Sequence, residues 1–229
     1  YVFDNTRWFY LYPVSGTRIY INYEIAPTNG VNDFSYYKLT LDSRTYIELS
    51  YSGKISLAGR LYGGTSWGND KRQYAIGGTP WLASSDDNLI SQDYESSLDN
   101  DQYYFMNNFV YPIRGYELAS RFGNHAVLMN FELRLPMLMY YFPTIEYLGQ
   151  FFGVFFVDMG VAWNDDYPKY SERDSWGNDD GTGWIMSYGL GPRFIFLGLP
   201  WQIDFTWEYN PHIGTITNRK TFLRIFPEF

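Results

Sequence analysis

The chain has 229 residues, 17 of them basic and 25 acidic, with a formal net charge of −8 and no cysteine. The lack of cysteine excludes disulfides, thiolate metal sites and cysteine nucleophiles, and the negative charge without a Lys/Arg cluster argues against a nucleic-acid partner. Charged residues reach only 18%, below the quarter or so usual in soluble domains, whereas aromatic residues reach 21%, an excess that needs a specific explanation.

The sequence contains no candidate transmembrane helix. Its most apolar run, 151–157 (FFGVFFV), is far shorter than the roughly 20 residues that a helix needs to cross a bilayer. The chain opens at Tyr1 on an aromatic segment, without the basic and apolar regions of a signal peptide. We therefore expect either a soluble protein or one that meets a membrane through β-strands.

Alternation of apolar and polar residues predicts a series of long β-strands. In 17–25, for example, Ile19, Ile21, Tyr23 and Ile25 alternate with polar side chains. The same period recurs in four further segments, 54–62, 127–135, 155–163 and 201–209. Less regular strands are expected at 1–10, 34–49, 183–196 and 218–229, which makes about nine strands of roughly ten residues.

Two fold classes produce such alternation. In a soluble β-sandwich one strand face meets the core and the other meets water, but its strands are usually about five or six residues long. Here the strands are long, and their apolar faces end in Tyr23, Trp163, Trp201 and Tyr209. Because aromatic girdles border the apolar band of outer-membrane barrels, we favour an all-β, antiparallel transmembrane barrel.

The connections are of two kinds. Short turns are predicted at 26–33, 50–53 and 197–200, and long polar connections at 69–111, 164–182 and 210–220. Outer-membrane barrels usually have short turns at one rim and long loops at the other. Segment 84–101 is acidic and lacks Lys and Arg, and 178–181 reads NDDG. We interpret both as solvated external loops and not as calcium sites, because neither has the spaced ligands of an EF-hand.

Catalytic motifs are missing from the sequence. His125 and His212 are far apart in the chain, and neither belongs to an HExxH or GxSxG pattern. The predicted polar strand faces carry acidic residues together with basic ones, which indicates charge neutralisation in a barrel lumen; the acidic residues are Glu132, Asp158, Asp204 and Glu208. We therefore predict a protein that is not an enzyme and that has no cofactor and no metal.

A series of short motifs runs along the chain in a fixed order. They are IGGT at 76–79, PIRGY at 112–116, GN at 123–124, NFELRLP at 130–136, FVDMGVAW at 156–163, SYGLG at 187–191 and the terminal Phe229. This order resembles the carboxy-terminal half of the barrel of the Omp85 superfamily of bacterial surface antigens. DNTR at 4–7 and PVSG at 13–16 extend the resemblance to nearly the whole chain.

The resemblance implies that residues 1–229 are the carboxy-terminal portion of a sixteen-stranded outer-membrane barrel domain, whose long loop 69–123 folds into the lumen. Arg114, Gly115 and Tyr116 would form the loop tip, docked on Glu132 and Asp158 of the wall. Alternation independently places both carboxylates on the polar face. We expect Asp158 to be the main partner of Arg114, because Gly160 and Ala162 leave open space beside it.

The sequence departs from the family pattern at two places. The long connection between Gly78 and Arg114 resembles the branch found behind periplasmic propeller-like domains. The last strand, 221–229, carries Pro227 before the terminal Phe229, and proline cannot donate to a strand ladder, as suits a frayed strand at the barrel seam. Because nine strands are too few, we expect an amino-terminal half and periplasmic domains before Tyr1.

Three functions remain open at this point. The resemblance favours a Gram-negative outer-membrane protein that inserts or translocates other proteins, with outer-membrane lipid, unfolded client polypeptides and periplasmic or lipoprotein subunits as partners. The second is a passive anchor or export pore for an attached domain. The third is a soluble carbohydrate-binding β-sandwich that uses exposed aromatic residues.

Overall fold

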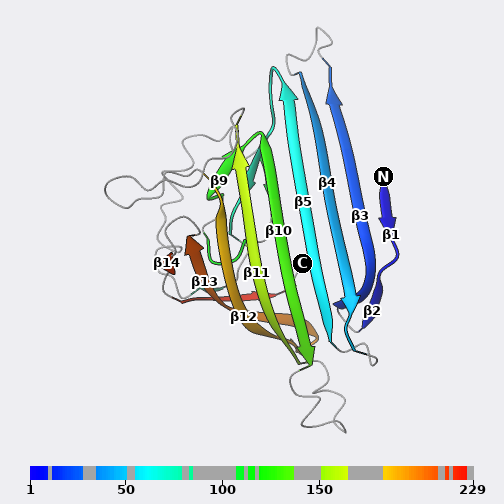
Figure 1. The fold of residues 1–229 in the computed structure, drawn as a ribbon, viewed down its shortest axis with the longest axis vertical. Coiled ribbons are helices and arrows are strands. Elements are labelled where there is room, and N and C mark those ends of the chain that lie inside the picture. The colour runs from blue at the N-terminus through cyan, green and yellow to red at the C-terminus, as the bar shows by residue number, and fades with distance from the viewer. Residues whose placement is uncertain are drawn as a thin grey trace.

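The computed structural model describes residues 1–9, 12–27, 35–50, 55–78, 83–84, 107–110, 113–116, 119–136, 151–164, 183–210, 215–216 and 219–225. Across these ranges the regular secondary structure consists of β-strands (Figure 1). None of the described segments forms a helix of the length and apolarity needed to cross a bilayer.

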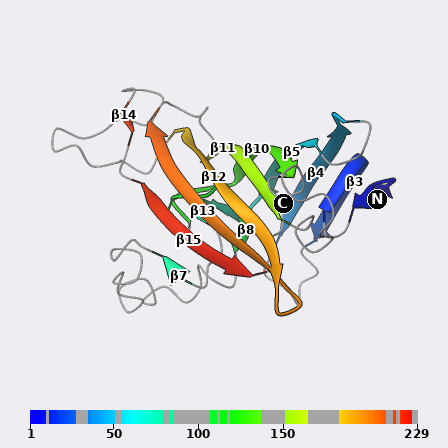
Figure 2. The ribbon, with the colours of Figure 1, turned by 90° about the horizontal axis from the view of Figure 1, so that it is seen from below.

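The wall of the molecule is one curved antiparallel sheet, seen from below in Figure 2. Its long strands are β3 (Tyr12–Ala26), β4 (Tyr36–Glu48), β5 (Ser56–Gly68), β10 (His125–Pro136), β11 (Phe152–Trp163), β12 (Ile185–Phe196) and β13 (Leu199–Asn210). Shorter strands complete its edges: β1 (Val2–Asp4) and β2 (Arg7–Phe9) on β3, β14 (Thr215–Ile216) and β15 (Lys220–Ile225) on β13, and β7 (Ala83–Ser84) on β15. The prediction of an all-β antiparallel fold is confirmed.

The strands predicted from alternation are present, mostly with wider bounds. The amino-terminal one differs, because 1–10 contains two short strands separated at Asn5–Thr6. There the Asp4 carboxylate accepts hydrogen bonds from the backbone N–H and the hydroxyl of Thr6, at 3.0 and 2.7 Å, which turns the chain. The predicted last strand corresponds to β15, and Pro227 and Phe229 lie outside the described residues.

The two faces of the wall differ in chemistry, because successive side chains of a strand point to opposite sides. Along β10 the concave face carries Asn130, Glu132 and Arg134, all buried, whereas the convex face carries apolar residues such as Phe131. Trp163, Trp201 and Trp207 lie on the convex face, whereas Asp158 and Asp204 lie on the concave face. Aromatic pairs lie near both ends of the strands there, with Tyr188 stacked on Trp207 and Phe196 edge-on to Trp201.

A second, smaller sheet is formed within the predicted long loop 69–123. It consists of β6 (Gln73–Ile76), which pairs in parallel with β8 (Asn107–Val110) and antiparallel with β9 (Arg121–Gly123). Figure 2 shows β8 inside the curve of the wall. The sequence did not predict these strands, which are short and pair through contacts distant in sequence.

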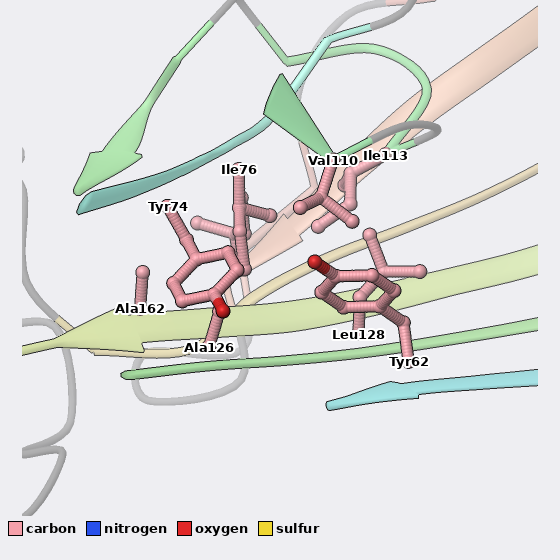
Figure 3. Packing of buried hydrophobic residues seen from close by; sticks show 9 residues of the cluster. Tyr62, Tyr74, Ile76, Val110, Ile113, Ala126, Leu128 and Ala162 are labelled. Atoms are coloured by element: carbon pink, nitrogen blue, oxygen red, sulfur yellow. The ribbon is translucent and has the colours of Figure 1, made fainter. Parts of the chain in front are cut away.

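An apolar cluster joins the small sheet to the wall (Figure 3). The small sheet and the loop supply Tyr74, Ile76, Val110 and Ile113, and the wall supplies Tyr62, Ala126, Leu128, Ala162 and Ile185. Gly64 of β5 admits the Tyr74 ring, since a Cβ atom there would lie 2.5 Å from it. The concave face of β10 is therefore apolar at this end and polar from Asn130 to Arg134, whereas on β11 the buried Asp158 is followed by buried apolar residues, Phe156, Val154 and Phe152.

The connections agree only partly with the predicted turns. The turn between β12 and β13 is tight, at Leu197 and Gly198, which both have positive φ. Most of the predicted turns at 26–33 and 50–53, the acidic segment beyond Ser84 and the NDDG segment at 178–181 lie outside the described residues.

Candidate functional site

The loop tip, residues Ile113–Tyr116, lies against the concave face of the wall. An isolated β-bridge fixes its start, in which the Ile113 N–H donates to the Gly78 carbonyl at 3.0 Å. The chain then turns at Gly115, whose φ of +93° is in the region that favours glycine. A Cβ atom at Gly115 would also lie 2.9 Å from Cγ2 of Thr206, so the tip approaches β13 closely.

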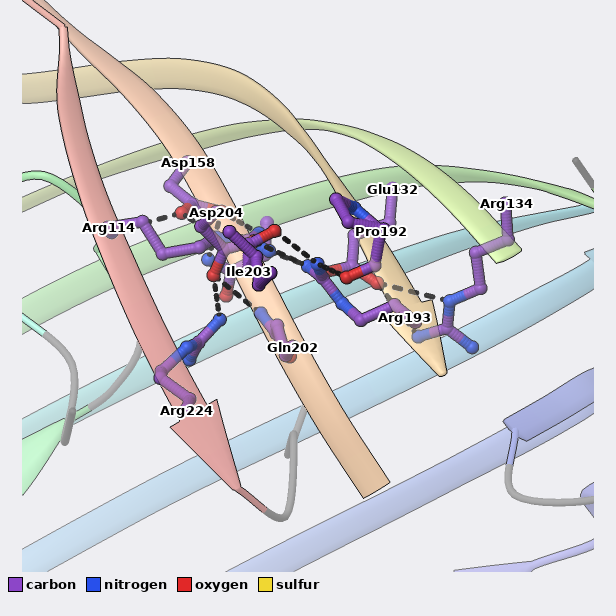
Figure 4. Close-up of polar contacts among 11 residues, drawn as sticks. Arg114, Glu132, Arg134, Asp158, Pro192, Arg193, Gln202, Ile203, Asp204 and Arg224 are labelled. Atoms are coloured by element: carbon purple, nitrogen blue, oxygen red, sulfur yellow. Dashed lines mark hydrogen bonds and ion pairs between the residues drawn. The ribbon is translucent and has the colours of Figure 1, made fainter. Parts of the chain in front are cut away.

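Arg114 binds two wall carboxylates (Figure 4). Its Nε and Nη2 donate to the two carboxylate oxygens of Asp158, each at 2.6 Å, and its backbone N–H donates to Asp158 Oδ2 at 3.1 Å. Its Nη1 donates to Glu132 Oε1 at 2.7 Å. The planar guanidinium thus makes a two-pronged contact with one carboxylate and a third bond to its neighbour on the adjacent strand, a geometry that a point-charge ammonium cannot reproduce.

Burial and the neighbouring carboxylates shift the pKa of Arg114 in opposite directions. The side chain is 1% exposed, and Cζ lies 3.6 Å from the centre of the Phe156 ring, a cation–π contact. Burial lowers the pKa of the guanidinium, but the adjacent Asp158 and Glu132 carboxylates raise that pKa more, so that it lies above its ordinary value. Arg114 therefore stays charged inside the protein, as an ion whose stability depends on its two partners.

Tyr116 and Gly115 extend the contacts of the tip to three more strands. The Tyr116 hydroxyl lies 3.1 Å from the Met186 carbonyl of β12 and 3.4 Å from the Tyr209 carbonyl of β13, and it accepts from the Met186 N–H. The Gly115 carbonyl accepts from Lys220 Nζ of β15 at 3.1 Å. With β10 and β11 already held through Arg114, the tip contacts every wall strand from β10 to β13 and also β15.

The space beside Asp158 is not open, in contrast to the expectation from Gly160 and Ala162. A Cβ atom at Gly160 would lie 2.6 Å from Cδ1 of Ile113 and 3.3 Å from Cγ2 of Ile76. The small residues on β11 therefore make room for the loop, whose apolar side chains fill the space. Arg114 follows directly after Ile113, so packing at Gly160 positions the guanidinium over Asp158.

A second buried charge cluster surrounds Asp204 of β13, and the sequence indicated only that Asp204 faces inward. Asp204 pairs with Arg193 of β12 at 2.8 Å and with Arg224 of β15, and it accepts from Gln202 Nε2 at 2.6 Å (Figure 4). Basic residues at 193 and 224, in register on either side of Gln202, are the signal that could have identified this cluster.

The remaining candidate residues have structural roles in the described part of the chain. Glu132 bonds Arg134 through its second oxygen at 3.0 Å, and Arg134 also donates to the Pro13 carbonyl. His125 stacks on Trp163 and lies 2.8 Å from the Thr65 hydroxyl. Within the described ranges, no group of three or more His, Cys, Asp or Glu side chains is arranged to hold a metal ion.

Comparisons with known proteins agree with this architecture. The Omp85 superfamily domain matches residues 2–222 of the chain. Among solved structures, the crystal structure of BamA from Haemophilus ducreyi lacking POTRA domains 1-3 is similar, with a TM-score of 0.61 and 17% sequence identity. The similarity covers 98% of this chain and 41% of that chain, so the chain spans less than half of its length. At this identity the likeness concerns the fold.

Proposed function

The chain belongs to the Omp85 superfamily, and on this basis we propose that it is part of a bacterial outer-membrane barrel that takes part in inserting or translocating other proteins. Residues 1–229 would be the carboxy-terminal portion of a barrel of sixteen strands. Its partners would be outer-membrane lipid, unfolded client polypeptides and periplasmic or lipoprotein subunits. Such a mechanism requires binding and release of strands and no covalent chemistry, so the protein would not be an enzyme.

The convex face of the wall supports the membrane location. Large apolar side chains are exposed along it, including Phe131, Phe155 and Leu190, and the aromatic pairs lie near both strand ends. A lipid bilayer buries such a band and favours aromatic rings at its two interfaces. An exposed apolar surface of this extent is unfavourable in water, which weighs against the soluble carbohydrate-binding sandwich.

The main support for the proposal is that the loop tip is docked on the consecutive wall strands from β10 to β15. Arg114 is buried against Asp158 and Glu132, and the same tip reaches β15, the last strand along the described chain, whose outer side pairs in the described structure only with the two residues of β7. An edge strand presents backbone N–H and C=O groups that can pair with a strand of another polypeptide. We propose that the docked tip keeps the wall ordered while the β15 edge receives client strands.

Assisted folding of a client tests this function. The full-length protein is placed in phosphatidylcholine and phosphatidylethanolamine vesicles, a urea-unfolded eight-stranded outer-membrane protein is added, and its folding is followed as heat-resistant mobility in gels. We expect faster client folding than in empty vesicles, with most of the gain lost in Arg114→Ala. A folding rate equal to that of empty vesicles would contradict the proposal and favour the passive anchor.

A further inference from the structure

The ladder between β12 and β13 is interrupted in the middle of the wall. Residues 186–190 of β12 pair with β13, and residues 193–196 pair with it again in the same register. Between them, Gly191 and Pro192 pair with β11 on one side but with no described residue of β13 on the other. Proline has no N–H to donate and is rarely found in a strand that is paired on both sides, so the break needs an explanation.

Arg193 supplies a donor at this break (Figure 4). Its Nη1 donates to the Pro192 carbonyl at 3.3 Å and to the Ile203 carbonyl of β13 at 3.4 Å. Since the register places Ile203 opposite Pro192, this is the carbonyl that a backbone N–H at position 192 would bond. Gly191 lets the strands stay close, because a Cβ atom there would collide with the Ile203 carbonyl oxygen. Arg193 is itself held in place, since it is 1% exposed and pairs with Asp204 at 2.8 Å.

A second side chain bridges the same two strands, and it belongs to the loop tip. The Tyr116 hydroxyl accepts from the Met186 N–H at 3.3 Å, and it lies 3.1 Å from the Met186 carbonyl and 3.4 Å from the Tyr209 carbonyl. Met186 and Tyr209 form the first cross-strand pair of β12 with β13. The two bridges differ in origin, because Arg193 is part of the wall whereas Tyr116 leaves the wall when the tip undocks.

The break divides the ladder into two short parts, one of five cross-strand pairs and one of four. Each pair adds only a small stabilisation, so a short ladder opens more easily than a long continuous one. A side chain that bonds both backbones at the end of such a part therefore contributes a large share of what holds it closed. Tyr116 does so at the start of the five pairs, and Arg193 does so where the four pairs begin.

We propose that β12 and β13 form an adjustable joint inside the wall, in which Arg193 is a permanent positioning residue and Tyr116 is a releasable one. Undocking of the loop tip would loosen residues 186–190 against β13, while Arg193 would keep residues 193–196 paired. This inference goes beyond the proposed function, since the joint exists whether or not the wall receives client strands. None of its tests uses a client, so failure of assisted client folding would leave the joint unaffected, and failure of the joint would leave the proposed function standing.

A double-mutant cycle tests the role of Arg193 at the break. In the full-length protein in vesicles, Arg193→Met removes the side-chain donors, and Pro192→Ala restores a backbone N–H opposite Ile203. We expect Arg193→Met to raise the unfolding equilibrium constant in urea by about two- to tenfold less when Pro192→Ala is present, the range for one net hydrogen bond. Loss of the Asp204 pair contributes in both backgrounds and cancels. An equal effect of Arg193→Met in both backgrounds would overturn the inference.

Hydrogen exchange of the same protein tests the division into two parts. We expect Tyr116→Phe to lower amide protection in 186–190 by about two- to tenfold and to leave 193–196 near the parent value. Arg193→Met should give the reverse pattern. Tyr188→Phe is the matched control and should change neither part, because it removes a hydroxyl from a ring that stacks on Trp207 on the convex face of β12. The inference is wrong if Tyr116→Phe or Arg193→Met loosens both parts equally or leaves its own part unchanged.

Discussion

At the scale of single residues, the site depends on one buried arginine with two carboxylate partners. Asp158 and Glu132 lie on neighbouring strands, β11 and β10, so Arg114 bonds across the strand pair and not along one strand. Removing one partner of a buried ion pair leaves an uncompensated charge, which generally costs about 3–5 kcal/mol. The guanidinium is therefore held strongly only while both carboxylates are present.

Arg114→Ala and Asp158→Ala should each lower the fraction of barrel that keeps heat-resistant mobility in gels. The expected loss corresponds to about 3–5 kcal/mol, because each variant leaves a buried charge without its partner. Arg18→Ala is the matched control, since Arg18 is half exposed and lies 3.7 Å from Asp4 in a surface pair of little energetic value. If all three variants behaved alike, Arg114 would not hold the loop.

Gly160→Ala should weaken loop docking through packing alone. The new methyl group would lie 2.6 Å from Cδ1 of Ile113, the residue next to Arg114, so the tip must shift away from Asp158. Ile113→Val removes that Cδ1 atom and should recover part of the lost stability in the double variant. The measurement is the heat-resistant fraction, and additive losses in the double variant would show that the two residues do not interact.

At the scale of the strands, alternation decides which side chains meet the membrane and which meet the loop. Leu190 and Phe196 lie on the same convex face of β12, Leu190 in the middle of the strand and Phe196 at its end. The ring of Phe196 packs edge-on against Trp201, as in an aromatic girdle. If the convex face spans a bilayer, these two positions differ in depth.

Leu190→Arg should destabilise the folded protein by about 2–4 kcal/mol in bilayers, and Phe196→Arg by about 0–1 kcal/mol, because the cost of a charge falls from the midplane to the interface. Urea titration of the protein in vesicles measures both. Equal effects at the two positions would mean that β12 does not cross a bilayer at this depth.

The strands could be predicted from the sequence because a period of two, as in 127–135 and 201–209, is a local property. The inward direction of Glu132, Asp158 and Asp204 follows from the same period. The small sheet could not be predicted, because Gln73–Ile76 is too short to show a period and its partner Asn107–Val110 is distant in the chain. The cluster at Asp204 likewise depends on register between three strands.

The contents of the lumen were also only partly predictable. Polar residues on the predicted inner face, such as Asn130 and Arg134, indicated a charged barrel lumen, but Ala126, Leu128 and Ala162 lie on the same concave face. In an alternating strand, an apolar residue on the polar face is recognised as part of a core only when its partner is known. Here the partners Tyr74 and Ile76 come from the loop itself.

At the scale of the whole molecule, the loop tip connects the strands of one side of the wall. It bonds Glu132 of β10, Asp158 of β11, Met186 of β12, Tyr209 of β13 and Lys220 of β15. A single segment that contacts consecutive strands restrains their motion relative to one another. Loss of the docked tip should therefore increase the motion of all the strands on this side of the sheet.

Hydrogen exchange should detect this restraint. In Arg114→Ala we expect amides of β12, β13 and β15 to lose protection by about tenfold or more. Arg114 itself bonds only β10 and β11, but the released tip also takes Gly115 and Tyr116 away from the other three strands. Amides of β3 and β4, which the tip does not contact in the described structure, should keep theirs. A loss confined to β10 and β11 would show that the tip does not couple the strands.

The neighbouring position of β5 and β10 has a consequence for how the chain folds. These strands pair from His125↔Thr65 to Arg134↔Ser56, although the whole segment 69–124 separates them, whereas the other neighbouring long strands follow one another directly in the chain. Closing a long connection costs more chain entropy than closing a short turn, and contacts between distant residues form slowly. Two meanders, β3–β5 and β10–β15, can thus assemble from near neighbours and join last along β5 and β10. The connection between the two meanders also holds them together once they have joined. Within it, Tyr74 packs against Tyr62 of one meander and Arg114 bonds Asp158 of the other.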